Sequence, residues 1–374
     1  MVSFLKERRE ADPSPERTGP LLSAYISATI VLAALLQGAG VEKYSAVVKL
    51  ILERAETIKE LPLLIQLSSE RKPLTRHVAL DAHIRLYNFH WSLYFDLLLG
   101  FSLGLLILLN YSFLSNYFND LLVSNYVVYF ETYIDWLMGY PAGFKLNGSL
   151  TRFLGQMHMW LLSLWKPHLA SLPIEMVMWA LGVMGMMGGA SLVTCAVVDL
   201  INLIVIPLHV SYKIAARLFN LELVVMASLF RLFRGKKWNV LRARLDSADY
   251  DLDQLLLGTI LFSVLVFVFP TITVYYTLFL FSILTKNLLI VALGGLTWII
   301  TDLPLYAIFN RHYLIGGIVL QTNLTETRIS YQTKPISHIL KPFLSRLSTA
   351  LWKFLSVNTL SSSIKGLPIS VNYT

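Results

Sequence analysis

The chain has 374 residues, of which 55% are hydrophobic and 14% are charged. Average soluble domains carry about 25% charged residues, so the composition excludes an ordinary soluble domain and indicates a polytopic membrane protein. The formal net charge is +8. We expect this excess at a cytosolic lipid face and not on nucleic acid, because no stretch combines basic and aromatic residues as nucleic-acid-binding modules do.

Residues 1–90 are predicted to form an N-terminal cytosolic or interfacial region. Residues 1–20 are polar and proline-containing, and we expect them to be disordered. Residues 21–36 are apolar but short for a span, which favours an interfacial or buried helix and leaves a span open. Residues 41–61 have a helical period whose apolar face is Tyr44, Val47, Val48, Ile51, Ala55 and Ile58. Its charged face is Glu42, Lys43, Lys49, Glu53, Arg54, Glu56 and Glu60. Such a helix lies on a membrane or packs on a partner, or equally on its own protein.

Residues 91–309 are predicted to form a transmembrane domain. Its apolar runs predict four spans, near 91–109, 174–206, 254–281 and 287–309. The second run contains "GVMGMMGGAS", whose small residues let helices approach closely, and it is either one long helix or a helix and a re-entrant piece. Residues 310–374 form a polar, basic, cytosolic tail that begins with "YLIGGIVLQT", which predicts a short strand or hairpin.

The predicted fold class is therefore an all-α polytopic membrane protein. It has about four transmembrane helices with interfacial amphipathic helices, a cytosolic basic loop over 207–253, and a short polar tail with a possible small β element. Lys and Arg number 12, 3, 8, 1 and 7 in the successive non-spanning segments, an alternation that predicts cytosolic termini. Four glycosylation sequons begin at Asn110, Asn147, Asn323 and Asn372. Only Asn147 lies in a predicted lumenal loop at some distance from a span.

The segment "FRLFRGKKWNVLRARLDSADYDLDQLLLG" joins two apolar stretches and carries the candidate site. Its aspartates form Asp-x-Asp triplets, a pattern that many sugar-nucleotide transferases use to bind a metal. A structural role is favoured, because acidic residues before a helix satisfy its free amides, and nearby cations can pair with them. "RGKK" also predicts a turn at Gly235. The candidate caps and ion-pair residues are Asp246, Asp249, Asp251 and Asp253.

The basic half of the segment predicts contacts with a partner or with lipid. The candidate residues are Arg231, Arg234, Lys236, Lys237, Trp238, Asn239, Arg242 and Arg244. Aromatic and polar residues among the charges favour docking of a protein partner. Contact with anionic lipid and charge that only sets topology are the alternatives.

Two acids, Asp96 and Asp199, lie within or near predicted spans and are expected to be functional or paired. Their carboxylates can bond to hydroxyls or to polar residues of a partner's span, and Asp199 can also bond to Asn202. Intersubunit or intrahelical contact is favoured. His77, His83 and His90 have no carboxylate that completes a metal set. No catalytic, metal-binding or cofactor-binding residue is predicted.

The string "LFRGKKWNVLRARLDSADYDLDQLLLGTILF" closely resembles the PIG-Q family, the Q subunit of glycosylphosphatidylinositol (GPI) N-acetylglucosaminyltransferase. "HVSYKIAARLFNLEL", "LYNFHWSLYFDLLLGFSLG", "FPTITVYY" and "LPLYAIFNRHYLIGGIVLQT" resemble the same family. The resemblance covers roughly residues 85–321. The chain is shorter than we expect for this family.

The resemblance implies a non-catalytic scaffold in an endoplasmic-reticulum complex. That complex transfers N-acetylglucosamine from UDP-GlcNAc to phosphatidylinositol on the cytosolic face, the first step of GPI-anchor biosynthesis. A separate transferase subunit carries catalysis, so the implied partners are that subunit, the other subunits and membrane lipid, with phosphatidylinositol as a candidate. Two alternatives are a membrane-embedded glycosyltransferase acting through Asp249, Asp251 and Asp253, and a multi-spanning transporter.

Overall fold

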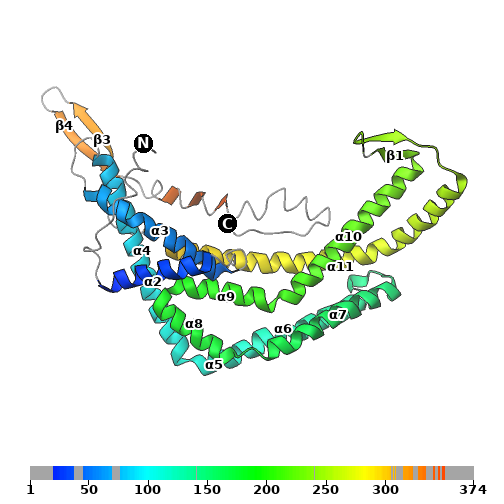
Figure 1. Cartoon of the computed structure of the whole chain (residues 1–374), viewed down its shortest axis with the longest axis horizontal. Coiled ribbons are helices and arrows are strands. Elements are labelled where there is room, and N and C mark those ends of the chain that lie inside the picture. Colours follow the sequence, from blue (N-terminus) through cyan, green and yellow to red (C-terminus); the bar gives the residue numbers. More distant parts are fainter. Residues whose placement is uncertain are drawn as a thin grey trace. The chain divides into compact units, whose positions relative to one another are not determined.

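The computed structural model describes residues 20–37, 45–69, 76–139, 141–239, 241–304, 306, 308, 315–322 and 327–333, with 340–341, 344–345 and 348–349. The expectations for residues 1–19 and for the sequons at Asn323 and Asn372 lie outside these ranges. The described chain is mostly helical (Figure 1). It divides into two compact units, each built from three separate stretches of sequence.

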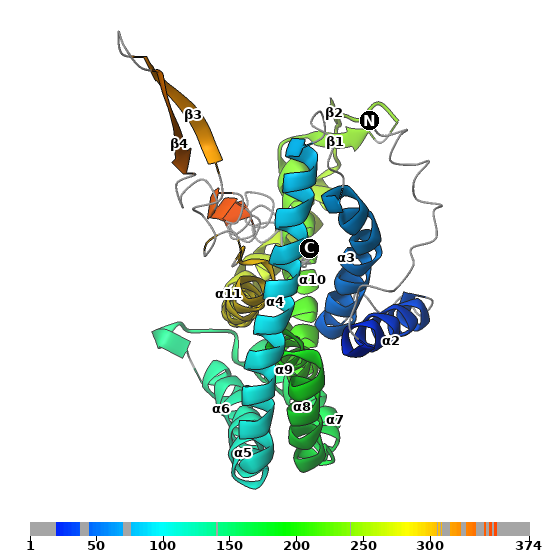
Figure 2. The same cartoon turned by 90° about the vertical axis from the view of Figure 1, so that its left-hand side faces the viewer.

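Unit 1 comprises Met1–Tyr111, Met176–Leu200 and Ala292–Ser348. It contains α2 (Pro20–Gln37), α3 (Ala46–Ser69) and α4 (Arg76–Leu109), most of α8 (Ile174–Gly188) and α9 (Ala190–Ile204), and the end of α11 (Leu252–Asp302). Helices α2 and α3 lie side by side, as do α3 and α4 (Figure 2). The tail forms an antiparallel hairpin of β3 (Ile315–Thr322) and β4 (Thr327–Thr333). The predicted β element is thus confirmed.

Helix α3 packs through the apolar face that its sequence predicts. Val48, Ala55 and Ile58 are buried. Ile58 and Leu61 form an apolar cluster with Leu86 of α4. The helix continues past the expected end at residue 61, although Pro62 lies within it. We attribute the continuation to packing, because Leu64 and Ile65 beyond the proline contact the same cluster. That burial offsets the hydrogen bond that proline removes.

Unit 2 comprises Ser112–Glu175, Ile201–Val291 and Thr349–Thr374. It contains nearly all of α5 (Tyr111–Phe118), a π-helix (Asn119–Asn125), α6 (Tyr126–Met138), a 3₁₀ turn (Pro141–Gly143), α7 (Gly148–Ala170), α10 (Ile206–Phe233) and most of α11. A short hairpin of β1 (Lys236–Asn239) and β2 (Arg244–Ser247) joins α10 to α11.

The core of unit 2 is aromatic. His158 of α7 stacks on Phe279 of α11 with 4.7 Å between ring centroids. Tyr275 of α11 donates a hydrogen bond of 3.0 Å to the Thr151 carbonyl of α7. On α10, Phe219 stacks on Tyr276 of α11 at 4.6 Å. These side chains hold α7 and α10 against α11, because large rings bury much apolar area in specific geometries.

Among the described residues, two helical stretches are long and apolar enough to cross a membrane, Ala82–Leu109 and Leu252–Asp302. The count rises to four if the bent pairs α7–α8 and α9–α10 each form one span. The predicted span at 91–109 lies within α4. The run at 174–206 is divided at Gly189, whose φ is +94°, so α8 and α9 are separate helices. The sequence left open whether this run forms one helix or two, and the structure has two.

Helix α11 replaces the two spans predicted at 254–281 and 287–309. It is one helix of 51 residues, and no loop interrupts it near Lys286. Lys286 is buried, and its ammonium lies 2.8 Å from His209 Nε2 and donates to Asn202 Oδ1 at 3.2 Å. These partners satisfy the buried charge. The count of Lys and Arg had assumed a loop between the two predicted spans, and α11 has none there. At about 1.5 Å per residue, α11 is about 77 Å long, over twice the thickness of a bilayer core.

Candidate functional site

The basic segment folds as a hairpin after α10. Helix α10 ends at Phe233, and Gly235 follows in a turn with a φ of +59°, the left-handed conformation that favours glycine. The Gly235 carbonyl accepts a hydrogen bond of 2.9 Å from the Ala248 amide, which closes the base of the hairpin. The turn predicted from "RGKK" is therefore present.

One face of the hairpin is polar, and its side chains bond to each other. Asp246 accepts from Asn239 Nδ2 at 2.8 Å and forms a 2.7 Å ion pair with Arg244. The Asn239 carbonyl oxygen accepts from the amides of Leu241 and Arg242 at 3.1 and 3.2 Å, so this residue also shapes the loop at the tip. Lys237 lies opposite Asp246 in the register. We call Lys237, Asn239, Arg244 and Asp246 the polar face.

The other face of the hairpin is apolar. Trp238 lies directly opposite Leu245, and each is 47% exposed. Side chains alternate between the faces of a strand, so Lys236 and Ser247 share this face. We call Lys236, Trp238, Leu245 and Ser247 the apolar face. The docking interpretation treated Trp238 and Asn239 as one surface, but the strand places them on opposite faces.

The remaining aspartates surround the start of α11. Asp251 directly precedes the helix, and its main-chain carbonyl accepts from the Leu255 amide at 3.1 Å. Asp253 lies in the first turn, where an acidic side chain complements the helix dipole. Asp249, Asp251 and Asp253 are all exposed. Across the described ranges, no three His, Cys, Asp or Glu side chains lie close enough together to hold a metal.

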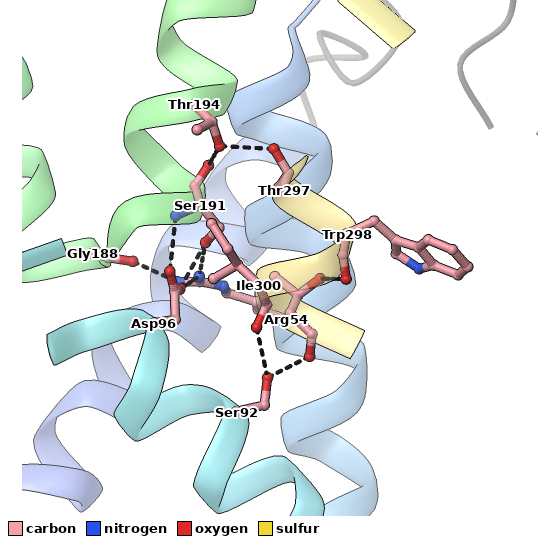
Figure 3. A network of polar contacts seen from close by, with 10 residues as sticks. Arg54, Ser92, Asp96, Gly188, Ser191, Thr194, Thr297, Trp298 and Ile300 are labelled. Atoms are coloured by element: carbon pink, nitrogen blue, oxygen red, sulfur yellow. Dashed lines mark hydrogen bonds and ion pairs between the residues drawn. The ribbon is translucent and has the colours of Figure 1, made fainter. Parts of the chain in front are cut away.

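Asp96 is the centre of a buried polar network in unit 1 (Figure 3). Its carboxylate forms an ion pair with Arg54 of α3, and the two side chains are 2% and 12% exposed. Ser191 at the start of α9 donates to the same carboxylate from its amide at 2.8 Å and its hydroxyl at 2.7 Å. Arg54 also donates to the Gly188 carbonyl at 2.7 Å and to the Ser191 hydroxyl. The network therefore joins α3, α4 and the α8–α9 junction.

Further hydroxyl contacts tie the end of α11 to this network. Ser92 of α4 donates to the Ile300 carbonyl at 3.3 Å and to the Thr301 carbonyl. Thr194 of α9 lies 2.7 Å from the hydroxyl of Thr297 (Figure 3). Each bond leaves one fewer unsatisfied polar group among apolar helices, where an unpaired group is costly.

Small residues allow α4 to approach α8 closely, as "GVMGMMGGAS" predicts. A Cβ on Gly104 would lie 2.4 Å from the Gly182 carbonyl oxygen, and one on Gly185 would lie 3.0 Å from the Gly100 carbonyl oxygen. At Gly189, a Cβ would lie 2.4 Å from Asp96 Oδ2. The glycines therefore make room for both the helix contact and the ion pair.

Asp199 caps α3 from a position far along the chain. Its carboxylate accepts from the Ala46 amide at 2.7 Å, the Val47 amide at 3.2 Å and the Ser45 hydroxyl at 2.6 Å. Asp96 and Asp199 thus bond to hydroxyls, one of the expected options, but their partners belong to other helices of the same chain. The contacts seen here join parts of one chain, and the favoured intersubunit contact stays a prediction. Asn202, the alternative for Asp199, bonds to Lys286 instead.

Replacing Asp199 with alanine is expected to lower the free energy of unfolding by about 1–2 kcal/mol, the usual worth of an N-terminal cap. The amides of Ala46 and Val47 lose their acceptor, so their hydrogen exchange should become faster. Asp199→Asn keeps one carbonyl oxygen and should lose less than Asp199→Ala. Unchanged exchange at both amides in the alanine variant would show that the contact does not stabilise α3.

Three important charges were not recognised in the sequence. Arg54 was assigned to the solvated face of its helix, and Lys286 to a loop. Glu222 of α10 was not singled out, although it is 2% exposed and neither carboxylate oxygen has a hydrogen-bond partner among the described residues. For Lys286 and Glu222 the available signal was a charge within a long apolar run. Arg54 carried no such signal, because its neighbours are charged.

Comparison with known proteins identifies the family. The model of the N-acetylglucosaminyl transferase component (Gpi1) family matches residues 48–314, more than two thirds of the chain. Mouse phosphatidylinositol N-acetylglucosaminyltransferase subunit Q is 37% identical over 219 residues, which cover 55% of this chain and 37% of the relative. Subunit GPI1 of Saccharomyces cerevisiae is 31% identical over 310 residues, covering 78% and 50%.

The Schizosaccharomyces pombe N-acetylglucosaminyl-phosphatidylinositol biosynthetic protein gpi1 is 38% identical over 198 residues, covering 53% of this chain and 30% of the relative. The chain thus spans half or less of the length of these curated relatives. No solved structure matches it. The resemblance inferred from the string around the basic hairpin is confirmed, and the chain belongs to the Gpi1 family of N-acetylglucosaminyl transferase components.

Proposed function

We propose that this protein is a non-catalytic scaffold subunit of the endoplasmic-reticulum complex that transfers N-acetylglucosamine from UDP-GlcNAc to phosphatidylinositol. The observation that carries the proposal is the family match over residues 48–314, which includes the basic hairpin and the network around Asp96. The site geometry supports a structural role. Asp96 and Asp199 are used to join helices, and a buried ion pair with its full set of hydrogen bonds holds elements in one arrangement.

Copurification tests the scaffold role directly. The tagged chain, expressed in cells that make GPI anchors, is expected to bring down a subunit with a nucleotide-sugar transferase fold together with other membrane subunits. The isolated chain should transfer no N-acetylglucosamine to phosphatidylinositol. Transfer by the isolated chain would instead support the membrane-embedded transferase alternative.

Asp251→Asn separates the scaffold from that alternative. The variant is expected to keep transfer by the assembled complex within about twofold, because asparagine caps a helix nearly as well as aspartate. If Asp251 held a metal, the loss of a charged ligand would abolish transfer. Asp246→Asn is the control, since it weakens the ion pair to Arg244 without touching the Asp-x-Asp triplets. A fully assembled but inactive Asp251→Asn complex would contradict the scaffold proposal.

The proposal places the protein in the endoplasmic-reticulum membrane with both termini in the cytosol. Asn147 then faces the lumen at the start of α7. Its Oδ1 accepts from the amides of Ser149 and Leu150 at 3.2 and 3.3 Å, and the residue is exposed, so its Nδ2 is open to glycosylation. We expect an Asn147→Gln variant to lose a glycan, seen as a change in mobility after glycosidase treatment. A glycan at Asn323 would place the tail in the lumen and reverse the orientation.

A further inference from the structure

The hairpin exposes apolar side chains in a cluster of its own. Trp238 and Leu245 form a cross-strand pair on the apolar face, and Leu241 at the tip is 97% exposed. A two-stranded hairpin in water is marginal unless its apolar face is covered. Within the described part of the chain this face remains exposed, so contact with another surface would stabilise the hairpin.

Chain connectivity puts this face near the bilayer. Strand β2 ends at Ser247, and α11 begins five residues later at Leu252. Five extended residues reach about 17 Å at most, so the hairpin stays near the first turn of a candidate span. The start of α11 exposes the apolar side chains of Leu252 and Leu256, next to the exposed acid Asp253. The hairpin therefore lies where headgroups meet the hydrocarbon core if α11 enters the membrane at this end.

Cations lie around the apolar cluster. Lys236, Lys237 and Arg242 are exposed, and their charged groups have no acidic partner among the described residues. Arg244 differs, because it pairs with Asp246. Exposed Lys and Arg beside a tryptophan are typical of segments that sit in the bilayer interface, where the ring lies at headgroup depth and the cations reach lipid phosphates.

We propose that the β1–β2 hairpin inserts its apolar face into the interface of a bilayer that contains anionic phospholipid. Trp238, Leu241 and Leu245 lie between the headgroups, and Lys236 and Arg242 contact lipid phosphate. The polar face, with Asn239 and Asp246, then points away from the membrane. This inference does not depend on the proposed function, although a substrate that is an anionic lipid would gather at the same place.

The bilayer is favoured over a protein partner for two reasons. The hairpin is tied by a short connection to a candidate span, so a lipid surface is always within reach. The phosphates of lipid headgroups can pair with the cations, whereas no described feature of the chain indicates an acidic protein partner. Coverage by another protein is treated as an outcome of the test.

The test places a polarity-sensitive fluorophore on either face of the hairpin. The chain has one cysteine, so Cys195→Ala removes the background thiol. Leu245→Cys and Lys237→Cys then form a matched pair, one residue apart in register but on opposite faces. Each labelled full-length chain is reconstituted in nanodiscs of phosphatidylcholine alone and in nanodiscs that also contain phosphatidylinositol, with and without a lipid that carries a quencher in its acyl chain.

The label at position 245 is expected to emit as in an apolar medium and to lose most of its emission to the lipid quencher. The label at position 237 should emit as in water and lose little. Lys236→Gln and Arg242→Gln combined should reduce quenching at position 245 more strongly in phosphatidylinositol discs than in phosphatidylcholine discs. Equal, water-like emission at both positions would overturn the proposal. So would protection of position 245 that requires added protein subunits and is insensitive to the lipid quencher.

A second measurement avoids the cysteine changes. The chain has eight tryptophans, so the contribution of Trp238 is taken as the difference in emission between the unaltered chain and Trp238→Phe. Brominated lipid should quench this difference. A difference spectrum that brominated lipid leaves intact would contradict insertion even if the cysteine variants fail to fold.

Discussion

Replacing Asp96 with alanine is expected to lower the free energy of unfolding by about 3–5 kcal/mol. The change leaves the Arg54 guanidinium buried without its carboxylate, and an uncompensated buried charge costs far more than a lost surface pair. It also removes the acceptor for the amide and hydroxyl of Ser191. The effect is measured as a fall in the midpoint of unfolding in detergent, followed by a probe of helix content.

The exposed ion pair between Lys166 and Glu131 is the matched control. Their charged groups are 3.1 Å apart, but the side chains are 55% and 35% exposed. Lys166→Ala should therefore cost less than about 1 kcal/mol. The double variant Arg54→Met, Asp96→Leu removes both charges together and should be more stable than either single alanine variant. If Asp96→Ala were no more destabilising than Lys166→Ala, the network would not hold unit 1 together.

Gly189→Ala is expected to be similarly severe, for two separable reasons. The backbone at this position has a φ of +94°, which costs a residue with a side chain about 1–3 kcal/mol. The new Cβ would also lie 2.4 Å from Asp96 Oδ2, so the carboxylate must shift, at about 1–3 kcal/mol more. Unfolding midpoints of the variant and the unaltered chain measure the sum.

Gly143→Ala separates the two contributions. Gly143 has a φ of +79°, but a Cβ there would meet nothing within 4 Å, so only the backbone cost applies. Gly189→Ala should exceed it, and the excess should shrink when the same change is made in Asp96→Ala, because the clashing oxygens are gone. Equal effects of the two glycine substitutions would show that Gly189 is needed for its backbone alone.

Much of the helical architecture follows from local sequence. The apolar face of α3, the turn at Gly235, the close approach of glycines between α4 and α8, and the strand at Ile315–Thr322 were all predicted. Each was predicted from residues within a few positions of one another, through side-chain period or backbone preference. The family was recognisable for a related reason, because its longest matching string is continuous.

Helix ends and the division of the apolar runs into spans were harder to predict from the sequence. At the break, a side chain on Gly189 would clash with Asp96, 93 positions earlier. Within the continuous α11, the Lys286 ammonium contacts Asn202 and His209. A charge within an apolar run indicates a loop unless partners are available. Whether they are available is decided by other helices and not by the run itself.

The sequence by itself determined the membrane class, the family and the composition of the basic segment, because each depends on residue types or on a contiguous string. Only the tertiary structure decided how the charges are used. It brings Arg54 to Asp96, places the Asp199 carboxylate on the first turn of α3, and separates Trp238 from Asn239 onto opposite faces of one hairpin. The physical reason is that a carboxylate satisfies an arginine, a hydroxyl or a helix terminus equally well. Which of them it meets depends on helices that pack through apolar surface.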